Sequence, residues 1–135
     1  MNSKAKSAFG AKICVTSEGD CLDSKVDPRF GRCRYFIFAD AGTLEFEAVE
    51  NPNIESTGGA GIQSAQLVAV KKVNVVVTGN VGPNAFQTLH LAGIEVFTGA
   101  SGTVKEAIEK YKKGEFKAVS GPTAGSHSGM PNKNK

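Results

Sequence analysis

The 135-residue sequence has no tryptophan and only two histidines, and it lacks any apolar run near the ~20 residues that a membrane-spanning helix needs. Its first twelve residues, MNSKAKSAFGAK, contain lysine but no apolar stretch long enough for a secretory signal. We therefore expect a cytoplasmic protein without a membrane partner. With His90 and His127 as the whole histidine complement, a histidine-based catalytic dyad is hard to assemble.

Several sequence motifs of enzymes and metal sites are also missing. The three cysteines are an odd number and form no C-x-x-C pair, which argues against a zinc ribbon, a thioredoxin-type centre and a disulfide framework. There is no P-loop and no G-x-S-x-G elbow, and the segment from Gly59 to Ser64 lacks the third glycine of a dinucleotide fingerprint. The predicted strands at 12–16 and 73–77 carry no carboxylates for a two-metal nuclease. We expect a binding protein that is not an enzyme.

Charge is distributed unevenly along the chain. The net charge of +3 comes from Lys4, Lys6, Lys133 and Lys135 in two tails without acidic residues, and the remainder carries 12 basic and 13 acidic residues. A nucleic-acid-binding domain usually concentrates Lys and Arg on its folded surface, so no nucleic-acid partner is expected. We predict disordered tails at 1–11 and 120–135 around a single domain at 12–119.

The apolar pattern between the tails alternates strands with helices. It predicts strands at 12–16, 35–39, 44–49, 73–77 and 94–97, and helices at 62–72, 83–92 and 103–113. The last helix has capping-box spacing from Thr103 to Glu106. A turn at 40–43, with Gly42 at a position suited to positive φ, joins two strands into a hairpin, whereas the strand–helix–strand units favour parallel pairing. The predicted fold is α/β, with a mixed five-stranded sheet and helices on its faces.

Glycine-rich loops form the first candidate site. The loops at 17–31, 56–61, 79–83 and 99–102 should meet at the carboxyl ends of the parallel strands, where open α/β sheets bind ligands. Three of these loops lead into helix N-termini, whose free N–H groups attract anions. The candidate ligand-binding residues are Gly58, Gly59, Gly61, Gly82 and Asn84. The alternative is that these glycines only turn the chain.

The second candidate site is the segment from Val26 to Phe36. Arg29, Arg32 and Arg34 are every arginine of the chain, and Gly31 and Cys33 lie among them. Neighbouring guanidinium groups are expected to lower the pKa of the Cys33 thiol, and a thiolate ligates soft metals. The alternative is a small buried cysteine beside a solvated charge cluster.

The other cysteines, and His90, are weaker candidates for metal ligands than Cys33. Cys21 lies in a loop and is a candidate second metal ligand. Cys14 lies inside the first predicted strand and is expected in the core. His90 sits near an apolar helix stripe and is expected to pack or to face solvent.

The sequence resembles the dinitrogenase iron–molybdenum cofactor biosynthesis family, the NifX-like and NifB-C-terminal-like proteins. The resemblance extends over nearly all of 12–119 and rests on Val26-Asp-Pro-Arg-Phe-Gly-Arg-Cys-Arg-Tyr-Phe36, Glu50-Asn-Pro52, Gly58-Gly-Ala-Gly-Ile62, residues 79–85, Gly93-Ile94 and residues 102–114. It implies a ribonuclease-H-like three-layer fold without nuclease activity. It also implies binding or carriage of an iron–sulfur or molybdenum-containing cluster for delivery to an apo-metalloenzyme or a cluster-assembly protein.

The sequence departs from the family at two positions. Many members carry His just before the Phe-Gly pair, where this chain has Arg29, and Cys33 stands where a small residue is usual. Either Cys33 replaces the histidine as a ligand, or charge and backbone N–H groups alone hold the cluster.

Two alternative functions remain open from the sequence. One is an enzyme or sensor that acts on a phosphate-bearing small molecule in the same pocket. The other is a protein–protein interaction module that uses the strand at 44–49 or a tail.

Overall fold

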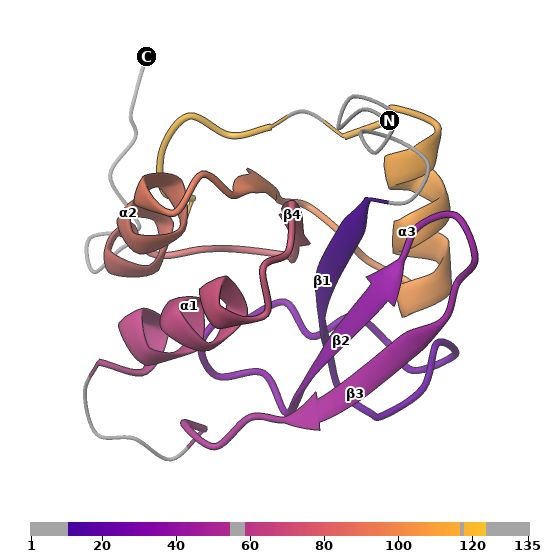
Figure 1. The fold of residues 1–135 in the computed structure, drawn as a ribbon, viewed down its shortest axis with the longest axis horizontal. Helices are drawn as coiled ribbons and strands as arrows, with labels where there is room; N and C mark the ends of the chain where they lie inside the picture. The colour runs from indigo at the N-terminus through magenta and orange to yellow at the C-terminus, as the bar shows by residue number, and fades with distance from the viewer. Residues whose placement is uncertain (1–10, 55–58, 117, 124–135) are drawn as a thin grey trace.

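A computed structural model describes residues 11–54, 59–116 and 118–123 of the chain. These residues form five strands and three helices in an α/β arrangement (Figure 1). In chain order the elements are β1 (Lys12–Ser17), β2 (Tyr35–Asp40), β3 (Phe46–Glu50), α1 (Ala60–Val70), β4 (Val75–Val77), α2 (Pro83–Leu91), β5 (Glu95–Phe97) and α3 (Val104–Lys112). No helix in these ranges is long and apolar enough to cross a bilayer.

The sheet is mixed, as predicted. Its strand order is β3-β2-β1-β4-β5, with β1 antiparallel to β2 and parallel to β4. β2 and β3 form the predicted hairpin, and β4 and β5 are parallel. β4 reads Val-Val-Val and is fully buried, because helices cover both faces of the sheet there.

Two apolar cores lie on opposite faces of the sheet. One contains Ile13, Val15 and Ile37 and packs against α3. The other contains Phe36, Phe38 and Val76 and packs against α1 and α2. Alternate residues of each strand enter alternate cores, which places α3 on one side and the other two helices on the opposite side (Figure 1).

Backbone conformation accounts for the shifted ends of α1. The predicted helix at 62–72 instead begins at Ala60, because Gly59 has φ 76° and acts as the N-cap. Lys72 has φ 59°, which ends the helix before its predicted end. The hairpin turn also differs from prediction: its left-handed residue is Leu44 with φ 66°, not Gly42, whose N–H is held by Asp40 Oδ1 at 2.7 Å.

At both ends of the predicted domain, residues next to its boundaries pack on the domain. Ala11 is fully buried, and its carbonyl oxygen accepts the Ala41 N–H at 2.9 Å. At the other end, Val119 donates to the Val96 carbonyl. Thr123 donates to the Val81 carbonyl at 2.8 Å and accepts from the Val81 N–H at 2.9 Å. The predicted tail residues at 1–10 and 124–135 lie outside the described part of the chain.

The capping box of α3 gives a direct test of local stability. The Thr103 hydroxyl accepts the Glu106 N–H at 3.1 Å, and the Glu106 carboxylate accepts the Thr103 N–H at 2.9 Å. Thr103→Ala should lower the free energy of unfolding by about 1 kcal/mol, because a first-turn N–H loses its acceptor. Urea denaturation would measure this, with the exposed Ser101→Ala as control. Equal stability of the two variants would contradict the assignment.

Candidate functional site

Two loops from distant parts of the sequence join at the carboxyl ends of β1 and β4. The Asn80 N–H donates to the Pro28 carbonyl at 2.8 Å, and the Phe30 N–H donates to the Asn80 carbonyl at 3.3 Å. These bonds form a short parallel bridge between Arg29 and Asn80. The structure therefore brings the arginine-rich segment against the loop that precedes α2.

Glycines permit the closest of these approaches. A Cβ added to Gly79 would lie 2.6 Å from the Cα of Pro28. A Cβ on Gly31, which has φ 95°, would lie 3.1 Å from the Cα of Gly61, and one on Gly61 would lie 3.3 Å from the Cβ of Ala85. The loop before β2, the start of α1 and the start of α2 are thus in direct contact. A side chain at Gly79 would collide with the Pro28 backbone, and Gly31 has a positive φ that residues with side chains rarely adopt.

The N-termini of α1 and α2 lack side-chain caps. Gly59 and Gly82 are their N-caps, and neither helix has an acidic residue in its first turn. The first N–H groups of a helix have no acceptor within the helix itself, and together they form its positive end. In contrast, α3 satisfies these groups with its capping box. Within the described ranges, the first turns of α1 and α2 therefore have no side-chain cap, and both lie at the glycine contacts; Pro83, the first residue of α2, has no N–H.

The candidate glycines and Asn84 occupy these helix starts. Gly59 and Asn84 are exposed, and Gly61 and Gly82 are half-buried. Asn84 is the second residue of α2, and its carbonyl accepts the Thr88 hydroxyl at 3.0 Å. Gly58 lies outside the described residues.

The Arg29 side chain turns back onto its own loop. Its Nε donates to Asp27 Oδ1 at 3.1 Å and its Nη2 donates to Asp27 Oδ2 at 3.3 Å. The Asp27 side chain is 2% exposed, whereas that of Arg29 is 62% exposed. The hydrogen bond to Asp27 and its charge raise the pKa of Arg29 above its ordinary value. Arg29 is therefore fixed at the rim of the loop with its charge compensated by a buried carboxylate.

Arg32 and Arg34 do not join Arg29. The Arg32 Nη1 donates to the Ile54 carbonyl at 3.0 Å, on the chain that leads toward α1, and Arg34 is exposed. The expected convergence of the three guanidinium groups on the glycine loops is thus not present among the hydrogen bonds of the described residues. Sequence proximity places these residues in one loop, but Arg29 bonds to Asp27 whereas Arg32 bonds to the Ile54 carbonyl.

The expected activation of Cys33 is wrong. Burial raises the pKa of the Cys33 thiol to about 12, and the nearby Asp27 charge raises it as well. Backbone hydrogen bonds at Cys33, Gly31 and Ser17 lower it by less. The thiol is enclosed in the core beneath α1 and α2, where desolvation disfavours the charged thiolate. The Cys33 residue has no surface exposed to solvent in this structure.

Cys21, the other predicted ligand, lies apart in an exposed loop. Its sulfur is 3.3 Å from the Ser24 hydroxyl, and its thiol is free. Cys14 is buried as predicted, and its pKa is raised by desolvation. His90 stacks on Phe86 at 5.6 Å between ring centroids, which agrees with a packing role. No group of three or more His, Cys, Asp or Glu side chains within the described ranges could hold a metal ion.

Two buried polar residues that sequence reasoning passed over organise the site. Asn51 is 2% exposed, and its amide donates to the carbonyls of Gly31 at 3.0 Å and Cys33 at 2.8 Å. The Ser64 hydroxyl of α1 also donates to the Gly31 carbonyl, at 3.3 Å. Asn51 belongs to the Glu50-Asn-Pro52 motif. Its position directly after a predicted strand is the sequence feature that could have identified it as a site residue.

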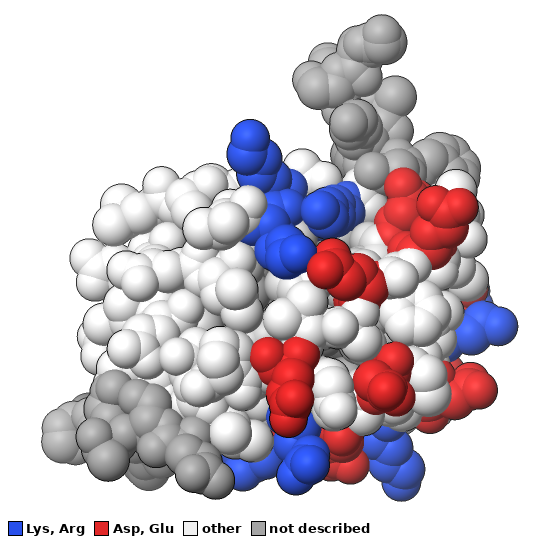
Figure 2. Space-filling model, turned by 60° about the horizontal axis from the view of Figure 1, so that its bottom comes forward, with Lys and Arg blue, Asp and Glu red and all other residues white. Residues whose placement is uncertain are grey.

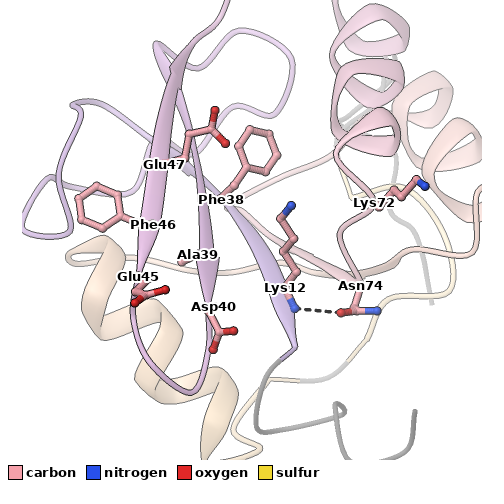
Figure 3. A pocket seen from close by; sticks show the side chains of 9 residues that line it. All are labelled: Lys12, Phe38, Ala39, Asp40, Glu45, Phe46, Glu47, Lys72 and Asn74. Carbon is pink, nitrogen blue, oxygen red and sulfur yellow. Dashed lines mark hydrogen bonds between the residues drawn. The ribbon is translucent and has the colours of Figure 1, made fainter. Parts of the chain in front are cut away.

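A cavity of about 490 Å³ lies at the opposite end of the sheet (Figure 3). Figure 3 shows Lys12 pointing up between the β2–β3 hairpin and Asn74, with its backbone N–H bonded to the Asn74 side chain. Glu45 and Glu47 line the hairpin side. This cavity is at the amino ends of β1 and β4 and does not involve the glycine loops.

The surface carries charges of both signs. Figure 2 shows Lys and Arg side chains interspersed with Asp and Glu side chains on one face, beside a broad area without either. Neither α1 nor α2 contains a charged residue, whereas α3 carries five. This face offers no single-sign basic stripe of the kind that binds nucleic acid.

Comparisons with known proteins agree on one family. Residues 11–114 match the family model described as dinitrogenase iron-molybdenum cofactor. The apo form of the orange protein from Desulfovibrio gigas is 42% identical, with a TM-score of 0.80 over 82% of this chain and 94% of that one. A proposed NifB protein from Thermotoga is 32% identical, with a TM-score of 0.70 over 92% and 99%. An uncharacterized protein of Methanocaldococcus jannaschii is 29% identical over 70% of this chain and 82% of its own length.

The crossing at Gly79 predicts a steric effect. Gly79→Ala should lower the free energy of unfolding by about 1–3 kcal/mol, because the new Cβ meets backbone atoms of Pro28 that cannot rotate away. Gly121→Ala is the matched control, since a Cβ there has nothing within 4 Å. Chemical denaturation of both variants would measure the difference. A Gly79→Ala protein as stable as the control would refute the close crossing.

The cysteines should differ sharply in reactivity. With a pKa of about 12, roughly one Cys33 thiol in ten thousand is ionised at pH 8, and the thiolate is the reactive form. Iodoacetamide should therefore modify Cys21 in the folded protein and leave Cys14 and Cys33 intact. All three should react in guanidinium chloride. Peptide mass spectrometry would measure this, and rapid modification of native Cys33 would contradict its burial.

Proposed function

Because the chain belongs to the dinitrogenase iron–molybdenum cofactor family, we propose that it binds and carries an anionic iron–sulfur or molybdenum-containing cluster, or a precursor of one. We propose that it is a carrier without catalytic activity. The observation that carries this proposal is the contact between two uncapped helix N-termini, those of α1 and α2, at the loop that contains Gly31.

The peptide groups at this contact favour a negatively charged ligand. First-turn N–H groups and the positive ends of the helix dipoles act together as an anion seat. Neither first turn contains an acidic residue, so no first-turn carboxylate opposes this positive end. The small residues Gly61 and Ala85, which meet there, let a ligand approach the backbone closely.

The donor set favours a preassembled cluster over a bare metal ion. A bare ion needs several protein ligands, and no cluster of three suitable side chains occurs among the described residues. A preassembled cluster brings its own sulfide ligands and requires hydrogen-bond donors and positive charge instead. Ligation by Cys33 would first require loss of a proton from a buried thiol of high pKa. We therefore propose that N–H groups and charge hold the cluster, and that Cys33 supports the loop from inside.

A carrier of this kind needs a recipient and a compatible compartment. We propose that the recipient is an apo-metalloenzyme or a cluster-assembly protein. We propose the cytoplasm as the compartment, because the three cysteines are free thiols, which persist in a reducing environment.

Asn84→Asp tests the anion seat without enlarging a side chain. A carboxylate in the first turn of α2 interacts favourably with the helix dipole, so the variant should be as stable as the wild type or slightly more stable. The same charge should weaken anaerobic binding of tetrathiomolybdate roughly tenfold, because like charges repel across a short distance. Visible absorption and calorimetry would measure affinity, and a thermal melt would measure stability.

Gln87→Glu is the matched control, because it places the same charge on an exposed position one turn farther along α2. It should bind tetrathiomolybdate nearly as well as the wild type. Equal affinities for Asn84→Asp and the wild type would refute the assigned seat. Tight binding of inorganic phosphate with no binding of tetrathiomolybdate would favour a phosphate-bearing ligand and reject the cluster.

A further inference from the structure

The pair formed by Asp27 and Arg29 joins a buried carboxylate to an exposed cation. Asp27 is 1% exposed as a residue, and its Oδ1 accepts both the backbone N–H and the Nε of Arg29 at 3.1 Å. Its Oδ2 accepts Nη2 at 3.3 Å. A buried carboxylate without a partner is strongly unfavourable, so this arrangement holds Arg29 firmly.

Asp27 is itself fixed to the sheet. Its N–H donates to the Thr16 carbonyl at 2.9 Å, and the Thr16 hydroxyl donates to the Asp27 carbonyl at 2.6 Å. The Thr16 hydroxyl also lies 2.7 Å from that of Thr78, at the end of β4. The Asp27 backbone is therefore bonded to the end of β1, and through the Thr16 hydroxyl it is linked to Thr78, directly after β4.

The geometry leaves the outer edge of the guanidinium group for a second anion. The contact with Asp27 uses Nε and one Nη2 hydrogen, which are two of the five N–H donors, so three remain beyond this pair. Those on Nη1 and Nη2 form a fork that can bind two acceptor atoms at once. The Arg29 backbone lies beside Asn80, two residues before the N-cap of α2, so the loop that carries this fork adjoins the proposed anion seat.

We propose that Asp27 is a positioning residue that aims Arg29 at an anion presenting two sulfur or oxygen acceptors on one face. This inference rests on the proposed function and assigns a residue to its site. The alternative role for Asp27 is simple charge compensation, which would weaken anion binding. The two roles predict opposite effects of removing the carboxylate.

Asp27→Asn separates the two roles because it keeps the side chain's size and raises the net charge by one. Positioning predicts at least threefold weaker binding of tetrathiomolybdate, whereas charge compensation predicts tighter binding. Glu18→Gln is the matched control, since Glu18 is exposed and its charge also acts on Arg29. Glu18→Gln raises the net charge by the same one unit but removes no hydrogen bond to the Arg29 guanidinium group. The affinity for tetrathiomolybdate should therefore stay the same or increase.

The mobility of the Arg29 side chain can be measured without ligand, which tests the role of Asp27 independently of cluster binding. The chain has only three arginines, so the ¹⁵N spectrum of arginine Nε–H groups contains three signals at most. The Arg29 Nε–H should be rigid in the wild type by heteronuclear NOE and should become as mobile as that of exposed Arg34 in Asp27→Asn. If wild-type protein binds no tetrathiomolybdate, the proposed function fails, and this signal still decides whether Asp27 orders Arg29.

Arg29→Lys provides a second variant that leaves Asp27 in place if Asp27→Asn does not fold. Lysine keeps the charge and loses the planar fork. Positioning predicts that Arg29→Lys loses as much affinity as Arg29→Gln. Wild-type affinity of Arg29→Lys for tetrathiomolybdate would overturn the positioning role of Asp27. So would a folded Asp27→Asn protein that keeps both wild-type affinity and a rigid Arg29 Nε–H signal.

Discussion

The site depends on the close approach of three backbone segments at the carboxyl ends of β1 and β4. Gly79 crosses Pro28, Gly31 crosses Gly61, and Gly61 meets Ala85. Because almost no side-chain atoms separate these segments, the starts of α1 and α2 are held together. Asn51 strengthens the arrangement by binding two carbonyl groups of the loop that contains Gly31. The same crossings that hold the fold therefore also bring two sets of free peptide donors together.

Much of the architecture follows from local sequence patterns. Alternation and β-branched runs identified all five strands, and the capping box located the start of α3, because each signal depends on neighbouring residues. The start of α1 was displaced because a glycine N-cap leaves no side-chain signal. The turn after β2 was misjudged because Asp40 binds two successive N–H groups and moves the left-handed residue to Leu44.

The candidate site was harder to predict, because loop side chains take their direction from tertiary contacts. Sequence spacing correctly brought Gly31, Gly61 and Gly79 to one edge of the sheet. It could not show that Cys33 enters the core, where desolvation determines its pKa. Nor could it show that Arg29 pairs with Asp27, two residues away, since a carboxylate near an arginine in sequence is equally compatible with an exposed position.

The burial of Asp27 changes how positive charge is supplied to the site. A cluster of arginines suggests that guanidinium groups attract the ligand, yet Arg29 is neutralised by its partner and Arg32 binds a carbonyl group. The peptide groups of α1 and α2 supply further positive charge at the glycine crossings. Peptide dipoles cannot be titrated and do not move with side-chain rotamers. Their direction is set by the backbone at the start of each helix, which the glycine crossings hold in place.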